Sequence, residues 1–301
     1  MNLIKRTIII PATGLLLLSG CADHSAKDAI SKFQTASAVV IANAEAEYTS
    51  ANKKERDAEI DTRIYLGQSI EPGIFFGEEL LVIKHDDLKA RLDALAALKE
   101  HGNLLLALVN SNAPNDAKNA VNSLDDAVLN LKNSLKKASP DQEFRDKAGA
   151  FAVIAGEVSK LVMEKKIKKA LDKAIILSEE VVTPLINLLQ QEMLNHFPQL
   201  QRGSLSNTFA ARIKSYNKEL PSNLEKRKKA GAEIKKAGDA WEALLFRPDP
   251  GFETMKQAHK TLVSYAKSDK TPQNLEELVA AMDAFTERAK IIADSIKTIQ
   301  Q

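Results

Sequence analysis

Residues 272–300 read PQNLEELVAAMDAFTERAKIIADSIKTIQ, and the spacing of their hydrophobic side chains decides the fold class. These side chains recur three and four residues apart, at Leu275, Leu278, Met282, Phe285, Ala289, Ile292, Ile296 and Ile299. Such a heptad seam predicts a helix that packs one apolar stripe against its neighbours. A second segment repeats the spacing at Val121, Leu124, Val128, Leu131 and Leu135. The two seams predict an all-α fold, an elongated antiparallel bundle of long helices with coiled-coil-like seams.

The composition of the 301-residue chain agrees with a helical bundle. Hydrophobic residues make up 44% and charged residues 27%, which is typical of a globular protein. Gly (12) and Pro (10) are sparse and aromatic residues reach only 5%, so turn formers and strand formers are both scarce. This composition argues against a β-sandwich, a β-barrel or a Gly-rich nucleotide-binding fold.

Hydrophobic spacing and helix caps divide the chain into predicted helices at residues 26–67, 86–110, 115–138, 140–182, 184–197, 206–219, 223–246, 252–268 and 272–300. A cap residue followed by Pro marks three helix starts, at Ser139-Pro140, Asp249-Pro250 and Thr271-Pro272. Pro184 either kinks one very long helix or begins a new one. The stretch 197–207 is a candidate boundary between a long-helix part, 29–197, and a shorter-helix part, 198–301. A single continuous bundle is the alternative.

The amino terminus carries the most specific signal. Residues 1–6 form a short basic head, residues 7–18 form a mostly apolar stretch, and Leu18-Ser19-Gly20-Cys21 follows directly. Because a bilayer span needs about 20 apolar residues, this stretch is too short to cross a membrane comfortably. A basic head, a short apolar core and small residues at its end are the parts of a secretory signal peptide.

The four residues that end this segment closely resemble the lipobox of bacterial lipoproteins. The resemblance implies cleavage by signal peptidase II between Gly20 and Cys21, which removes residues 1–20. It also implies a diacylglyceryl group on the sulfur of Cys21 and a further acyl chain, such as palmitate, on the new amino group. Two or more acyl chains anchor a protein stably to a bilayer. In enterobacterial lipoproteins Asp after the cysteine retains the protein at the inner membrane, so Ala22 implies the outer membrane, facing the periplasm. Residues 21–28 are predicted to be a lipidated tether.

Charge and cysteine content restrict the function further. The net charge of +2 comes from Lys5 and Arg6, so removal of residues 1–20 leaves 40 basic and 40 acidic side chains. A neutral chain has no overall field to attract nucleic acid, so we do not expect nucleic acid as a partner. Cys21 is the only cysteine, which excludes disulfides, zinc–thiolate sites, iron–sulfur clusters and cysteine-protease chemistry.

A search for catalytic or ligand-binding motifs finds none. P-loop, dinucleotide-binding, nucleophile-elbow and zincin motifs are missing from the sequence. The acids of His85-Asp86-Asp87 are placed to begin a helix. Glu192 and His196 share one helix face, but a metal site needs more ligands than these two. We therefore expect no catalytic residues, no metal and no cofactor.

Three surface segments are candidates for contact with lipid or a partner. The lysine face surrounds apolar positions 167, 171 and 175 and consists of Lys165, Lys166, Lys168, Lys169 and Lys173. A second basic cluster consists of Lys226, Arg227, Lys228, Lys229, Lys235 and Lys236. The third is the apolar stretch 70–83, which contains Phe75 and Phe76. The alternative for the basic clusters is the solvated side of a bundle helix, and for the apolar stretch a connection tucked over the bundle end.

The sequence thus leads to an expectation of a non-catalytic envelope lipoprotein. It would be attached to the membrane through Cys21 and would act by contact with an unidentified envelope protein, as a scaffold, adaptor or inhibitor. The first alternative is a membrane-active protein that inserts into or remodels bilayers through residues 74–83 and the lysine face. The second is an envelope hydrolase whose catalytic carboxylates leave no motif.

Overall fold

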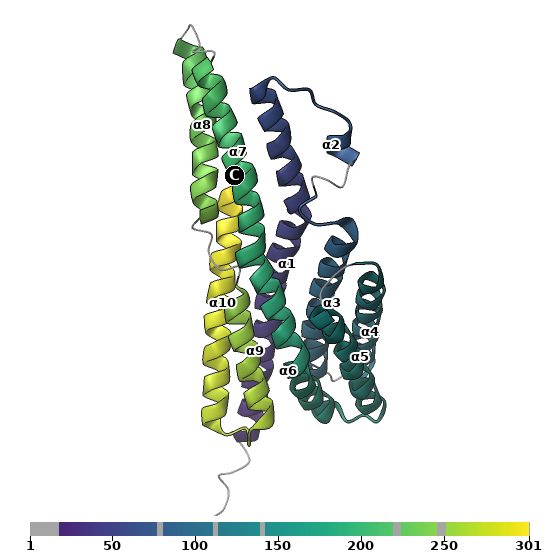
Figure 1. The fold of residues 1–301 in the computed structure, drawn as a ribbon. Coiled ribbons are helices and arrows are strands. Elements are labelled where there is room, and N and C mark those ends of the chain that lie inside the picture. The colour runs from purple at the N-terminus through teal and green to yellow at the C-terminus, as the bar shows by residue number, and fades with distance from the viewer. Residues whose placement is uncertain are drawn as a thin grey trace, which may run out of the picture.

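A computed structural model of the chain describes residues 18–76, 81–110, 114–138, 142–218, 224–245 and 251–300. These residues form ten α-helices and one π-helical turn, η2, with no strand among them (Figure 1). The elements in chain order are α1 (Leu18–Leu66), α2 (Gly73–Phe76), α3 (His85–Asn110), α4 (Pro114–Lys137), α5 (Gln142–Met163), α6 (Ile167–Gln191), η2 (Glu192–His196), α7 (Phe197–Lys218), α8 (Leu224–Leu245), α9 (Phe252–Lys267) and α10 (Pro272–Gln300). The all-α prediction is confirmed.

The long helices run along one axis of the molecule and mostly alternate in direction (Figure 1). The start of α1, the α5–α6 turn and the α9–α10 turn lie at one end, which we call the near end. At the opposite end α7 and α8 lie side by side as a hairpin that projects beyond the other described helices, and this end of the molecule is called the far end (Figure 1). Helix α1 alone spans 49 residues, or about 70 Å at 1.5 Å per residue.

One continuous hydrophobic core joins α1, α3, α4, α5, α6, α9 and α10. The seam of α4 is buried at all five of its predicted positions. The seam of α10 is buried at Leu278, Met282, Phe285, Ala289 and Ile292, while Leu275 is partly buried. The side chains of Ile296 and Ile299 lie outside the described part. Full burial of each Val, Leu, Ile, Met or Phe side chain among them stabilises the fold by about 1.5–3 kcal/mol through removal from water.

The predicted start of α10 is confirmed in detail. The helix begins at Pro272, and the Thr271 hydroxyl accepts a hydrogen bond from the Asn274 backbone N–H at 3.3 Å. In return the Thr271 backbone N–H donates to the Asn274 side-chain oxygen at 3.1 Å. This reciprocal pair satisfies two amide groups that a helix start leaves without intrahelical partners. The other two predicted cap–Pro starts, Ser139-Pro140 and Asp249-Pro250, lie outside the described residues.

The amino-terminal helix is longer than predicted. It begins at Leu18 rather than at residue 26, so residues 22–28, predicted to be a tether, are its first turns. No Gly or Pro stands between Cys21 and Leu66, and alanines are frequent early in this stretch, so nothing local interrupts the helix. Residues 1–17 and the side chains of Gly20, Cys21 and Ala22 lie outside the described part. The predicted cleavage, lipidation and sorting residues therefore stay predictions.

The helix predicted at 140–182 is wrong, because residues 164–166 form a turn between α5 and α6. Lys165 has a φ of +59°, a left-handed conformation that costs a non-glycine residue about 1–2 kcal/mol. The reversal lets α5 and α6 pack against each other and bury Ile154, Val158 and Ala174. This gain in buried area outweighs the strain of one turn residue.

The chain is helical without a break from Ile167 to Lys218. Pro184 lies inside α6, so of the two alternatives the structure supports a proline within one longer helix, and no new helix begins at residue 184. Pro198 is the second residue of α7 and, because η2 runs directly into α7, lies in the interior of this helix, where its missing N–H removes one backbone hydrogen bond. The stretch 197–207 is therefore helical rather than a loop, and the division at residue 197 stays a prediction.

Candidate functional site

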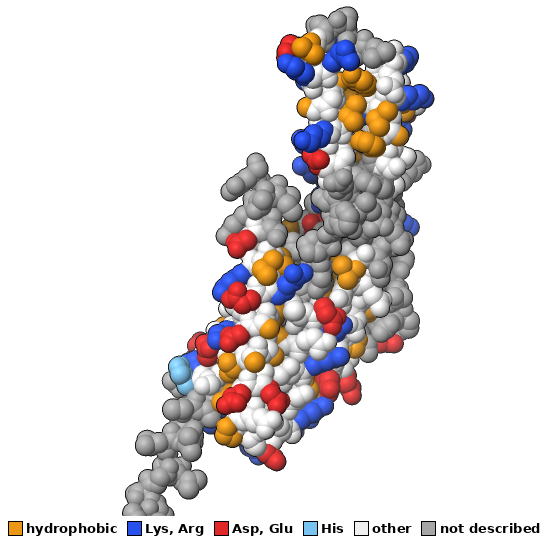
Figure 2. Space-filling model, turned by 90° about the vertical axis from the view of Figure 1, so that its left-hand side faces the viewer, with side chains coloured by type: hydrophobic (Ala, Val, Ile, Leu, Met, Phe, Trp, Pro, Cys, Tyr) orange, Lys and Arg blue, Asp and Glu red, His pale blue; other side chains and the backbone are white. Residues whose placement is uncertain are grey.

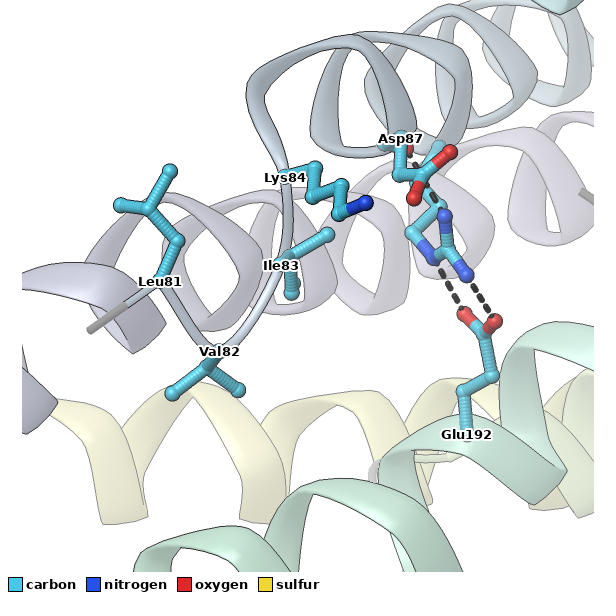
Figure 3. Close-up of a pocket in the computed structure, with 7 residues that line it drawn as sticks. Leu81, Val82, Ile83, Lys84, Asp87 and Glu192 are labelled. Atoms are coloured by element: carbon cyan, nitrogen blue, oxygen red, sulfur yellow. Dashed lines mark hydrogen bonds and ion pairs between the residues drawn. The ribbon is translucent and has the colours of Figure 1, made fainter. Parts of the chain in front are cut away.

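A three-helix cluster forms around Glu192, the first residue of the π-helical turn. Its carboxylate accepts a hydrogen bond from the Tyr48 hydroxyl of α1 at 2.8 Å. It also accepts two hydrogen bonds from the Arg91 guanidinium of α3, of which that from Nε is 2.8 Å long (Figure 3). Such a bidentate pair fixes both distance and orientation. Glu192 therefore ties α1, α3 and the α6–α7 segment together.

The electrostatics of this cluster shift the pKa values of Tyr48 and Arg91. Burial raises the pKa of Tyr48 well above 10, and the negative charge of Glu192 adds to the effect. Burial alone would lower the pKa of Arg91, but the hydrogen bonds and charge of Glu192 outweigh it and raise that pKa. Tyr48 thus stays protonated and Arg91 stays charged at neutral pH. The cluster is built to hold helices together rather than to transfer protons.

A pocket of about 240 Å³ adjoins the cluster, lined by Leu81, Val82, Ile83, Lys84, Asp87, Arg91 and Glu192 (Figure 3). The segment that forms its apolar side is fixed by Asn52, whose side-chain amide bonds both the backbone N–H and the carbonyl of Ile83 at 2.9 and 2.8 Å. On the polar side Arg91 donates to Glu192 and to the carbonyl of Asp87. The Arg91 guanidinium and the Glu192 carboxylate are thus engaged with each other.

Breaking the cluster should destabilise the fold. We expect Arg91→Met to lower the free energy of unfolding by about 2 kcal/mol, because the Glu192 carboxylate then loses the cation with which it pairs. This value is below that of a fully buried pair, since the Arg91 and Glu192 side chains are 19% and 26% exposed. The measurement is urea denaturation followed by circular dichroism. Lys89→Met on the same helix, which removes only an exposed pair with Asp93, is the control and should change stability by under about 0.5 kcal/mol.

The lysine face lies at the near end, in and after the α5–α6 turn. Lys165, Lys166, Lys168 and Lys169 are exposed, and Lys173 is half-buried. Lys166 pairs with Glu164 at 2.7 Å. The apolar positions between the lysines, Ile167, Leu171 and Ile175, pack against the core. This arrangement favours the solvated side of a bundle helix over an apolar contact surface.

The apolar stretch 70–83 is partly tucked against the bundle. Ile74 and Ile83 are buried, each with 6% exposure. Phe75 is 51% exposed, and the Arg56 guanidinium lies over its ring at 5.9 Å. The side chain of Phe76 and residues 77–80 lie outside the described part. Of the predicted contact residues in this stretch, the structure places Phe75 at the surface.

The second basic cluster lies on α8, where all six of its Lys and Arg side chains are exposed. Helix α8 packs extensively on α7 and on no other described element. Helix α7 is in turn fixed to the end of α1: the Thr62 and Thr208 hydroxyls are 3.3 Å apart, and Arg212 pairs with Asp61 at 2.5 Å. The Arg212 guanidinium also lies 5.2 Å from the ring centroid of Tyr65. The hairpin is thus held on one side and open on the other.

Known proteins offer no guide to these surfaces. No family model, no curated protein and no solved structure matches this chain. What the chain does is therefore inferred from its own residues.

The described residues contain no metal site of the usual kind. Among them, no group of three or more His, Cys, Asp or Glu side chains is placed to hold a metal ion. Glu192 and His196 share a helix face, but the Glu192 carboxylate accepts hydrogen bonds from Arg91 and Tyr48. The His196 side chain lies outside the described part. No described helix is both long and apolar enough to cross a bilayer.

Two buried histidines are the features that sequence spacing missed. The rings of His101 (α3) and His259 (α9) lie 6.3 Å apart, edge to face, inside the core. His259 hydrogen-bonds the hydroxyls of Ser178 at 2.8 Å and Thr183 at 3.3 Å, whereas neither ring nitrogen of His101 has a protein partner. Burial lowers the pKa of His101 to about 4 and that of His259 to about 3, with nearby His101 lowering the latter further. Each histidine falls among the apolar positions of its helix, a spacing that predicts burial but not the pairing.

Proposed function

We propose that this protein is a lipid-anchored protein of the bacterial cell envelope that acts by contact with another envelope protein, without catalysis. Support for the anchor comes from the lipobox-like residues that end at Cys21. Support for contact comes from the placement of two features at opposite ends of the molecule. The helix that starts beside Cys21 begins at the near end, and the open α7–α8 hairpin forms the far end (Figure 1).

This placement is the observation that carries the proposal. A lipid anchor at the near end would leave the hairpin tip directed away from the anchored membrane. The shared core holds the helices between the two ends as one unit, so the hairpin would be presented on a firm support. Binding surfaces on rigid elements need less ordering when a partner binds. A scaffold or adaptor needs a rigid binding surface of this kind, since it must reach a partner at a distance from its own membrane.

Substitution of the lipidated residue tests the anchor. Cys21→Ser should abolish incorporation of labelled palmitate and leave the precursor uncleaved, because the sulfur that receives the diacylglyceryl group is gone. The measurements are labelling, intact mass and membrane fractionation in cells. Ser25→Ala, four residues on, is the matched control and should be processed normally. A Cys21→Ser protein that is still cleaved and still membrane-bound through lipid would refute the anchor.

Fractionation also tests the expected membrane. The wild-type protein should sediment with outer-membrane markers, and Ala22→Asp should shift it to the inner membrane. An unchanged distribution would show that a different sorting rule applies.

Photo-crosslinking in cells tests action by contact. A photoreactive residue at Lys235 of the hairpin should capture a protein, whereas one at Lys168 of the lysine face should capture far less. Capture of lipid alone from Lys235 and Phe75 would contradict the proposal and favour the membrane-active alternative.

A further inference from the structure

The α7–α8 hairpin differs in charge from the rest of the chain. Residues 197–245 contain ten Lys and Arg against five Asp and Glu, a net charge of +5. The remainder of the chain after residue 20 contains 30 basic and 35 acidic side chains, a net charge of −5. The mature chain has no net charge, because the positive charge of the hairpin at the far end balances the negative charge of the remaining helices. A basic surface of this kind attracts an acidic partner.

The open side of the hairpin also carries hydrophobic side chains. Figure 2 shows them gathered in a row down the hairpin, with Lys and Arg along both edges. Leu224 is 63% exposed, and further hydrophobic side chains of the hairpin are only half-buried, at Phe209, Ile213, Tyr216 and Ile234. An apolar row with charged edges is the pattern that one helix of a coiled coil presents to another.

The shape of this row distinguishes a helix from a bilayer as its occupant. Within the bundle α1 and α6 each pack against three or more elements, whereas α8 packs extensively only on α7. A further helix laid along the row would cover the hairpin as the bundle helices cover one another. A bilayer offers a flat surface, whereas the row runs along the side of the projecting hairpin (Figure 2).

We propose that the open face of the α7–α8 hairpin binds an acidic amphipathic helix of a partner protein. The apolar side of that helix packs along the row of hydrophobic side chains, and its carboxylates pair with the flanking lysines. This inference rests on the proposed function, because it names the kind of partner that the far end contacts. The site is distinct from the Glu192 cluster, whose charges are already paired.

The direct test uses a defined probe and matched charge reversals. The probe is a fluorescent synthetic helix with a leucine seam flanked by glutamates, titrated into the full mature chain and followed by anisotropy. We expect the double variant Lys228→Glu/Lys235→Glu to weaken binding at least tenfold. Lys168→Glu/Lys169→Glu makes the same charge change at the near end and should alter affinity less than twofold. Leu224→Asp should weaken binding at least fivefold, because it places a charge in the apolar row.

Two further measurements complete the test. Raising the salt from 50 to 200 mM should weaken binding severalfold, since the lysines are exposed to screening, and a probe with lysines in place of glutamates should not bind. Circular dichroism checks that each variant keeps its helix content.

Several outcomes would overturn the inference. These are equal losses in the two double variants, tighter hairpin-dependent binding to phosphatidylglycerol vesicles than to the probe, or self-association through the hairpin in sedimentation. Such failures leave the proposed function standing if Lys235 still captures a protein in cells. Capture of no protein there, with Cys21 still lipidated, removes the contact function itself.

Discussion

Lowering the pH from 7 to 5 is expected to reduce the free energy of unfolding by about 4 kcal/mol, because two neutral histidines are buried in the core. Their pKa values in the folded protein, about 4 for His101 and about 3 for His259, lie below the ordinary value of 6.5. The unfolded chain therefore takes up protons below pH 6.5 while the folded chain does not. Over the 1.5 pH units down to pH 5 each histidine contributes about 2 kcal/mol to the loss.

Stability falls as the pH falls because both histidines have a lower pKa in the folded protein than in the unfolded chain. The stability held by neutral His101 and His259 is fully present above pH 6.5. It falls with pH until each folded imidazole titrates, near pH 4 and pH 3 respectively. The ring contacts and hydrogen bonds of the pair are made by Phe33 of α1, Phe151 of α5, and Ser178 and Thr183 of α6, none of which carries a charge. No carboxylate among these contacts compensates a proton on either ring.

Substitution separates the two contributions. His101→Leu should remove about half of the loss between pH 7 and 5, and should also raise stability at pH 7, because two buried nitrogens without partners disappear. His101→Leu/His259→Leu should remove nearly all of the pH dependence in this range. Urea denaturation at each pH measures the effect, and His85→Leu on the surface is the control. If the free energy of unfolding of the double variant still fell by about 4 kcal/mol between pH 7 and 5, groups other than these two histidines would cause the pH dependence.

Gly251→Ala is expected to lower the free energy of unfolding by about 3 kcal/mol. Gly251 caps α9 with a φ of +93°, a conformation that costs an L-residue about 1–2 kcal/mol. An added Cβ would lie 2.6 Å from Cδ1 of Ile292 and 2.8 Å from Cγ2 of Val40. Both side chains belong to the core, with exposures of 6% and 0%, so neither has room to move. Overpacking of this kind costs about a further 1–3 kcal/mol.

The control for this substitution, Gly156→Ala, is expected to raise the free energy of unfolding. Gly156 lies inside α5, and nothing is within 4 Å of the position its Cβ would take. Gly156→Ala should therefore stabilise the protein by about 0.5–1 kcal/mol, the usual helix preference for alanine. Urea denaturation of both variants at pH 7 gives the comparison. A Gly251→Ala protein within about 0.5 kcal/mol of wild type would contradict the close packing of α9 against α1 and α10.

The parts of the fold predictable from sequence are those set by residues close together in the chain. The α4 and α10 seams follow from the spacing of apolar residues, and the start of α10 follows from Thr271, Pro272 and Asn274. These features need only three to seven residues of context. The all-α class follows from them, because helices of such spacing bury their seams against one another.

Other features depend on contacts that the sequence does not display. The turn at residues 164–166 contains no Gly or Pro, and its residues favour helix, so only the packing of α5 on α6 explains it. The partners of Glu192 are 101 and 144 residues away, and its spacing to His196 indicated only that the two residues share a helix face. The basic cluster on α8 was visible in the sequence, but not the open row beside it, which depends on how α7 meets α1.

The π-helical turn at residues 192–196 also affects how α7 is rotated about its own axis. A π turn holds one residue more than an α turn, and each α-helical residue advances the chain by about 100° around the axis. In a regular α-helix one added residue would turn every side chain beyond it by that angle, but the wider π turn takes up the extra residue, so α7 continues with nearly the rotation that α6 alone would give it. The side that the hairpin presents to a partner therefore depends on this turn, which begins where Glu192 pairs with Arg91 and Tyr48.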